Sequence, residues 1–467
     1  MKKIYYIVCA ILASCLLDAC IHDDTSLADP DFSKLSIVSR YDTLSVNLSE
    51  ELVYKVEVVQ SEEEKSLTYE WAYATYDVKD DSGYPAKDSL KVISTDAELH
   101  YTFRKLGTYY LRLKVDNGDA ISFKGFTLNV TTPYDEGITI LSQDDAGTPR
   151  ISFLKTLTRQ EIESGVESKF VTDVLTKENP DYVIKNCTDL AQFTSTYMLL
   201  ASREDGVIYK LNAKTFGVMY KNRVRDVIPD FTCKELMGEK SKNWMLSENG
   251  NAYRYDLTFD EILIIDNAIG CDYDACFFGY SSSYQYFIDY DKSIIYSPSG
   301  MGVSTSSTYF EDYNIIGMVP WTITKLYTIV TSKEDPTQGK VFQTSGSFSR
   351  LTELQSFDAT DLKLDKNSTI MYSSVYKYAY YDYGNNIYRW NCTGQFPKTP
   401  FINFPSTKEI TAVALDPDKK QIYVCYVDSE RSGLKGGLDI YDANTGKIVE
   451  SYGGIADRPI RVFYKTK

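Results

Sequence analysis

The segment that decides the fold is ITAVALDPDKKQIYVCYVDSERSGLKGGLDIYDANTGKIVESY, residues Ile410 to Tyr452. A first strand pattern runs to Leu415, the turn residues DPD reverse the chain, and QIYVCYV supplies a second strand. GLDIYDANTGKIV then adds a third strand, a turn and a fourth strand. Four antiparallel strands in succession form one blade of a β-propeller, so the segment predicts that fold.

The third strand of this unit ends in Tyr441-Asp442, and similar endings recur upstream. Clear copies are Leu211-Asn212, Tyr255-Asp256 and Trp390-Asn391, and weaker copies are Tyr296-Ser297 and Gln343-Thr344. From Asn212 to Asp442 the intervals are 44, 41, 47, 47 and 51 residues, which is the spacing of propeller repeats. A divergent copy near Leu154 makes seven predicted blades over residues 133–467, although six or eight also fit. The segment that follows this copy, TRQEIESGVESKFVTDVL, predicts a helical insertion with Thr158 and Glu161 as a capping box.

The aligned Asp and Asn residues have two interpretations. They could form a ring of ligand or calcium sites, or each could bond to its own backbone within a turn. Repetition in every blade favours the turn, because a binding site breaks the symmetry of a repeat. Among the tryptophans, Trp244 and Trp390 occupy blade positions and are expected in the core. Trp321 lies beside Pro320, outside the repeated register, so it is the candidate ligand contact, as an exposed aromatic on a loop.

Residues 35–132 show short alternating strands of a different kind. LTYEWAYATY places Trp71 in the middle of a strand. In LGTYYLRLKVDNGD, Tyr109, Leu111, Leu113 and Val115 alternate with polar residues, and Asn117-Gly118 supplies a hairpin turn. About seven strands in about a hundred residues, with a central tryptophan, predict an immunoglobulin-like β-sandwich.

The N-terminus has the pattern of an export signal. Residues 1–19 contain two lysines and then an apolar run of signal-peptide length. LASC and LDAC, which end at Cys15 and Cys20, both resemble the bacterial lipobox. Cys15 has the better local match, but cleavage there would leave two leucines on the mature tail, so we expect the lipid on Cys20. An ordinary secretory signal is the alternative. Residues 20–34 then predict a flexible stalk, and acyl chains would anchor it without a membrane-spanning helix.

Composition narrows the classes of function. Asp and Glu number 65 against 50 Lys and Arg, a net charge of -15, which argues against nucleic acid or anionic lipid as a partner. The two histidines are His22 and His100, so residues 133–467 contain none. This excludes a Ser-His-Asp triad and the usual histidine metal sites there. No glycine motif for phosphates or dinucleotides occurs, so no cofactor is expected. The pair in CDYDAC, Cys271 and Cys276, is a poor zinc signature; a local disulfide or two buried thiols are expected.

These features together resemble one family. GTYYLRLKVDNGD is similar to a strand of PKD domains, and the aspartates after Cys20 resemble the surface-export signal of Bacteroidetes lipoproteins. With YDEGITILSQDDAGTPRISFL, Tyr134 to Leu154, the chain looks like the PKD-like surface lipoproteins of gut Bacteroidetes.

The resemblance implies a lipid-anchored outer-membrane protein on the cell exterior. It implies nutrient uptake beside a TonB-dependent SusC/SusD-type importer. The propeller would then bind an oligosaccharide or peptide, or dock onto the importer as an accessory subunit, without catalysis. Two alternatives remain: a surface glycoside hydrolase with a carboxylate pair in the propeller funnel, and a purely structural subunit.

Overall fold

The computed structural model describes residues 34–467, except 49, 62–64, 76–88, 239–242, 279–284, 300–301, 323, 346–347 and 349. The chain divides into two compact units, residues 1–131 and 132–467. Both are built from strands, so the all-β prediction is confirmed. Across the described residues, no helix has the length and apolar character needed to cross a membrane. The predicted signal peptide, His22 and Cys20 lie outside the described residues.

The first unit packs three sheets around one core. A five-stranded sheet has the order β2-β9-β8-β5-β6, and β3-β7 and β1-β4 are two-stranded sheets. The strands are β1 (Leu35–Val38), β2 (Thr43–Asn47), β3 (Glu51–Lys55), β4 (Glu57–Gln60), β5 (Thr68–Thr75), β6 (Lys91–Ser94), β7 (Glu98–Thr102), β8 (Gly107–Asp116) and β9 (Ile121–Thr131). All three sheets contribute side chains to one hydrophobic cluster.

The alternation predicted for this unit is present. Tyr109, Leu111, Leu113 and Val115 of β8 point into the core, each at most 5 % exposed. Trp71 is fully buried, and its indole N–H donates to the carbonyl of Asp96 at 3.1 Å. The hairpin turn between β8 and β9 lies at the predicted Asn117-Gly118. Whether the unit belongs to the immunoglobulin or PKD type stays a prediction.

The second unit is a β-propeller. Its described residues form seven four-stranded antiparallel sheets, which we number as blades 1 to 7. Blade 1 is β37 (Arg458–Lys465), β10 (Gly137–Gln143), β11 (Pro149–Lys155) and β12 (Phe170–Val171); blade 2 is β13 (Cys187–Gln192), β14 (Tyr197–Ser202), β15 (Val207–Asn212) and β16 (Val218–Arg223); blade 3 is β17 (Cys233–Met237), β18 (Trp244–Ser247), β19 (Ala252–Asp256) and β20 (Glu261–Leu263). Blade 4 is β21 (Ala275–Phe278), β22 (Gln285–Asp289), β23 (Ile294–Pro298) and β24 (Val303–Ser307); blade 5 is β25 (Tyr313–Thr322), β26 (Lys325–Ser332), β27 (Gln338–Ser345) and β28 (Leu351–Asp358); blade 6 is β29 (Ile370–Ser373), β30 (Tyr378–Tyr383), β31 (Asn386–Trp390) and β32 (Ile402–Asn403); blade 7 is β33 (Lys408–Leu415), β34 (Gln421–Asp428), β35 (Gly436–Asp442) and β36 (Ile448–Ala456).

The motif copies on which the repeat was predicted lie in or at the end of the third strands, including the divergent one at Leu154 in β11; in blade 6 the strand ends at Trp390 and Asn391 follows it. Apolar clusters then join neighbouring blades; one, for example, combines Ala191 and Leu199 of blade 2 with Leu236 and Met245 of blade 3. A blade therefore buries its two faces against its neighbours rather than within itself.

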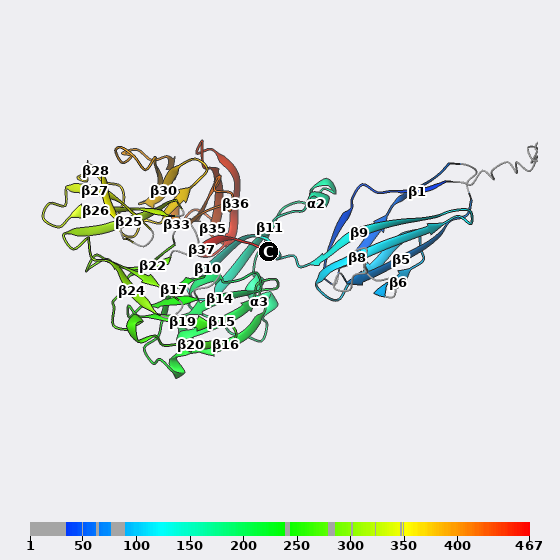
Figure 1. The fold of residues 1–467 in the computed structure, drawn as a ribbon, viewed down its shortest axis with the longest axis horizontal. Coiled ribbons are helices and arrows are strands. Elements are labelled where there is room, and N and C mark those ends of the chain that lie inside the picture. The colour runs from blue at the N-terminus through cyan, green and yellow to red at the C-terminus, as the bar shows by residue number, and fades with distance from the viewer. Residues whose placement is uncertain are drawn as a thin grey trace, which may run out of the picture. The chain divides into compact units, whose positions relative to one another are not determined.

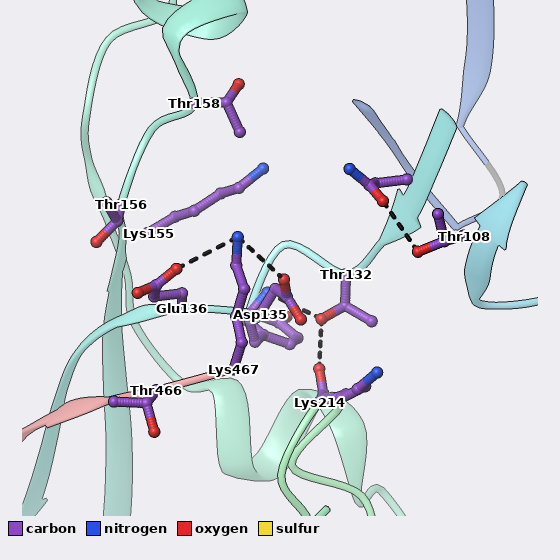
Figure 2. Close-up of polar contacts among 12 residues, drawn as sticks. Thr108, Thr132, Asp135, Glu136, Lys155, Thr156, Thr158, Lys214, Thr466 and Lys467 are labelled. Carbon is purple, nitrogen blue, oxygen red and sulfur yellow. Dashed lines mark hydrogen bonds and ion pairs between the residues drawn. The ribbon is translucent and has the colours of Figure 1, made fainter. Parts of the chain in front are cut away.

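The ring closes between the two ends of the unit. The C-terminal strand β37 pairs antiparallel with β10, and Figure 1 shows the two strands next to each other. Arg150 Nε donates to Asp457 Oδ2 at 2.8 Å, and Ser152 Oγ donates to the carbonyl of Ile455 at 2.5 Å. Lys467 Nζ lies 3.3 Å from Glu136 Oε2 and 3.8 Å from Asp135 Oδ2 (Figure 2). The last strand and the first strands thus complete one blade.

The prediction for the segment that follows β11 is confirmed in part and corrected in part. Helix α2 (Arg159–Glu163) begins within the predicted capping box, directly after Thr158: Thr158 N donates to Glu161 Oε2 at 2.8 Å, and Glu161 N donates to Thr158 Oγ1 at 3.3 Å. A second helix, α3 (Val174–Glu178), follows. Between them lies β12, the outer strand of blade 1, so the segment is not wholly helical. Three 3₁₀ turns complete the described helices: η3 (Glu204–Gly206), η4 (Val224–Asp226) and η5 (Asp266–Ala268).

Candidate functional site

The first strand of each blade lines the axis of the propeller. First strands of neighbouring blades contact one another, as β37 does with β13, β13 with β17, and β29 with β33. Five of them contain a β-bulge at a similar place. The bulged residues are Thr188, Lys234, Ile316, Thr411 and Ile460. A bulge re-aims the side chains beside it and is common next to functional sites.

The residues that follow the bulges break the symmetry of the repeat. In blades 5 and 7 they are Gly317 and Ala412. In the three neighbouring blades 1, 2 and 3 they are Arg461, Asp189 and Glu235. One side of the axis therefore carries small residues, and the other carries three charged side chains on adjacent strands.

Asp189 is the buried member of this charged group, with 4 % of its surface exposed. Its Oδ1 accepts from the N–H of Leu190 and its Oδ2 from the N–H of Leu236, both at 2.8 Å. Arg461 Nε lies 3.6 Å from Asp189 Oδ1, while 37 % of the arginine side chain is exposed. Glu235 Oε2 accepts from the N–H of Cys276 at 3.0 Å. Backbone bonds thus fix both carboxylates, and Asp189 sets the position of the guanidinium.

Burial and charge act in opposite directions on this group. Burial raises the pKa of the Glu235 carboxyl, Arg461 partly opposes that shift, and Asp189 adds to it. Asp189 in turn raises the pKa of Arg461. Burial also raises the pKa of the Cys233 and Cys276 thiols beside Glu235, and it raises the pKa of Tyr290 to about 12. These neighbours stay neutral, and Arg461 keeps its positive charge.

The charged group faces a cavity of about 640 Å³, within the usual size range of small-molecule sites. First strands of blades 3 to 7 and β37 contribute to its wall. Arg461, Lys366 and Lys419 supply positive charge, and Glu235 is the one carboxylate among the described lining residues. The neutral lining includes Tyr290, Phe277, Met318, Asn367, Ser368, Thr369 and Thr411. Polar groups and apolar faces therefore converge on one cavity.

Trp321, the predicted ligand contact, is placed differently from its prediction. It lies within strand β25, not on a loop, and it is half-buried. Its ring stacks on Tyr327 with centroids 5.0 Å apart and lies 5.3 Å from Tyr372. Strand β25 is longer than the other first strands of the propeller, so Trp321 falls outside the repeated register of the sequence. Trp244 and Trp390 lie in the core, as predicted.

The repeated Asp and Asn residues close their own turns, as predicted. Asp442 Oδ1 accepts from the N–H and hydroxyl of Thr445, both at 2.7 Å. Asp256 Oδ1 accepts from the N–H groups of Thr258 and Phe259, and Asn212 and Asn391 each accept from the residue two positions on. All six cysteines of the described residues are free, including Cys271 and Cys276. No group of three or more potential metal ligands is found in the described part of the chain.

The charged group was not predicted, although the sequence contains a signal for it. Cys187-Thr188-Asp189 and Cys233-Lys234-Glu235 share the order Cys-x-acid and lie 46 residues apart, within the range of the repeat. An acid in a buried first strand, repeated in only two blades, marks a break in symmetry. The sequence around Arg461 gives no such signal, because β37 lies at the end of the unit opposite to the other strands of blade 1.

Several solved structures are distantly similar to this chain. No family model matches the chain, and no curated protein matches it. A solved quinonprotein alcohol dehydrogenase-like protein from Bacteroides thetaiotaomicron is similar at 14 % identity and a TM-score of 0.48, over 92 % of this chain and 99 % of that one. A protein of unknown function from the same species has 12 % identity and a TM-score of 0.34, over 94 % and 96 %. The β-propeller domain of Swd1 from Myceliophteria thermophila has 8 % identity and a TM-score of 0.36, over 59 % and 91 %.

Proposed function

We propose that the protein is a non-catalytic binding protein whose propeller holds part of a nutrient glycan or peptide in the axial cavity. The observation that carries this proposal is the broken symmetry of the first strands. Three charged residues occupy one side, where the repeat alone would place equivalent residues in every blade. A cavity with a few convergent polar groups on an apolar wall is the usual form of a ligand site.

The environment of the carboxylates supports binding rather than hydrolysis. A glycoside hydrolase needs two carboxyl groups on either side of the scissile bond. Glu235 reaches the cavity, but Asp189 is buried and both of its oxygens accept backbone hydrogen bonds. The funnel pair required by the hydrolase alternative is therefore not formed by these two residues.

The cellular setting is proposed from the sequence. The lipobox at Cys20 and the aspartates after it support a lipid-anchored protein of the outer membrane that faces the exterior. The likeness to PKD-like lipoproteins supports a role beside a SusC/SusD-type importer, to which the propeller would deliver its ligand. Acylation is tested by mass spectrometry of the mature N-terminus, where a free residue other than Cys20 would refute the anchor.

The binding role is tested by titration calorimetry of the full chain against a panel of oligosaccharides and peptides. Ala275 of β21 lines the cavity, so Ala275→Trp should fill it and abolish binding of any ligand found. Phe259→Trp is the matched control, because Phe259 is 73 % exposed and lies in the turn between β19 and β20, apart from the cavity lining. Equal binding by wild type and Ala275→Trp would place the ligand elsewhere. If an importer co-purifies with the protein but no oligosaccharide or peptide binds to it, the result would favour a purely structural subunit.

A further inference from the structure

The charge of the axial cavity is opposite to that of the whole protein. The chain carries 65 acidic against 50 basic residues, yet its described cavity lining has three cations and one carboxylate. Lys366 precedes β29 and Lys419 follows β33, so the two lysines come from opposite ends of neighbouring first strands. Both are exposed residues at the cavity wall. An anionic ligand would thus be drawn toward the cavity despite the acidic surface.

Arg461 has unused hydrogen-bonding capacity. A guanidinium offers five N–H donors in a planar fork. The Asp189 contact, at 3.6 Å, is too long for a hydrogen bond, and within the described residues the guanidinium donates none. The side chain is held by the attraction of Asp189, it is partly exposed, and Arg461 belongs to the cavity lining. This is the arrangement that suits a bidentate bond to a carboxylate.

Glu235 offsets only part of the positive charge at the cavity. Because burial raises the pKa of its carboxyl, the neutral form is favoured relative to a solvent-exposed glutamate. Even with both carboxylates ionised, Asp189 and Glu235 offset two of the three positive charges of Arg461, Lys366 and Lys419.

The rest of the wall suits a compact ring with hydroxyl groups. Asn367 and Thr369 can donate or accept hydrogen bonds. Tyr290 and Phe277 add aromatic surface. An extended peptide is usually recognised along an open groove or a sheet edge. This cavity is instead surrounded by first strands, which fits a single residue at the end of a ligand.

We propose that the axial cavity binds an acidic sugar residue, with Arg461 as the partner of its carboxylate and Lys366 and Lys419 as supporting cations. The inference rests on the proposed binding function and narrows it to a uronic acid at a chain end. Loss of a charged hydrogen bond to the carboxylate should lower the affinity at least tenfold.

The test is titration calorimetry of the purified full chain with trimers of galacturonate, glucuronate and mannuronate, each paired with its methyl ester. At least one acid should bind, and its ester should bind at least tenfold more weakly. Added salt should weaken binding of the acid but not binding of the ester. Arg461→Met should lower the affinity for the acid tenfold or more. Arg461→Lys keeps the charge but lacks the planar fork, so its affinity should lie between those of wild type and Arg461→Met. Lys366→Met and Lys419→Met, at exposed positions, should lose affinity without loss of fold. Arg223→Met removes an exposed arginine of β16, outside the cavity lining, and should match wild type.

Several results would overturn the inference. Equal affinity for acid and ester would do so, as would wild-type affinity in the Arg461 and both lysine variants. Binding of an acidic peptide but of no uronate would show that the ligand class is wrong. If neutral ligands bind and Ala275→Trp removes them, the proposed function survives and the acidic sugar does not. If none of these ligands binds, both proposals fail.

Discussion

Asp442 and Asp189 show two different uses of a carboxylate in the same propeller. Asp442 bonds to residues within three positions of itself, and these bonds lower the pKa of its carboxyl. Such local chemistry can be predicted from a short stretch of sequence. Asp189 instead contacts Leu236 and Arg461, which lie far along the chain. Its role depends on which strands become neighbours, so the sequence alone could not give it.

Trp321 contributes to stability through packing between strands. We expect Trp321→Ala to destabilise the propeller by about 2 kcal/mol, less than a fully buried tryptophan, because it removes the stack on Tyr327 and the contact with Tyr372. Trp321→Phe should keep most of the stability. Urea denaturation, with unfolding followed by circular dichroism, measures both. Loss of ligand binding in a fully stable Trp321→Ala protein would instead support the original prediction of a ligand contact.

Lys465 makes stability depend on pH. Its side chain is 1 % exposed, its Nζ donates to the carbonyl of Asp135, and burial lowers its pKa to about 8. Between pH 8 and its unfolded pKa near 10.5, the unfolded state binds more protons, so stability rises with pH. The free energy of unfolding of wild type minus that of Lys465→Met should increase by about 2–3 kcal/mol from pH 7 to 10. Urea titrations across this range test it, and a constant difference would contradict the shift.

At the scale of elements, the third strands of the blades were predictable, whereas the short outer strand of blade 1 and the bulges of the first strands were not. The third strands end in turns with their own local pattern, so their copies revealed the repeat. The outer strand β12 is only Phe170–Val171, too short to show alternation, and it was absorbed into a predicted helix. The bulges of the first strands have no local signal, because each exists only in relation to the strand paired with it.

The capping box of α2 can be tested as an element. Thr158→Ala removes the acceptor of the Glu161 N–H, and we expect a local destabilisation of about 1 kcal/mol. Amide hydrogen exchange should therefore be about fivefold faster in α2 and unchanged in the blades. Thr158→Ser keeps the oxygen and serves as the control. Faster exchange throughout blade 1 in Thr158→Ala would show that the helix supports the sheet rather than only its own turn.

At the scale of the whole molecule, the propeller is a cycle made from a linear chain. Each blade covers the face of the next, and blade 1 is completed only when β37 joins β10. The same strand brings Arg461 beside Asp189, so ring closure and assembly of the charged group are one event. The candidate site therefore exists only in the closed ring.

Truncation separates the two units and tests this closure. Residues 132–467 form a compact unit with their own cores, so we expect them to fold without residues 1–131. Residues 132–456 lack β37, which leaves the apolar faces of blades 1 and 7 exposed and Asp189 without its counter-ion. A buried charge that loses its partner costs several kcal/mol, in addition to the lost apolar contacts. Calorimetry should thus show a cooperative transition for 132–467 and none for 132–456. An equal melting temperature for the two fragments would mean that the ring does not depend on its last strand.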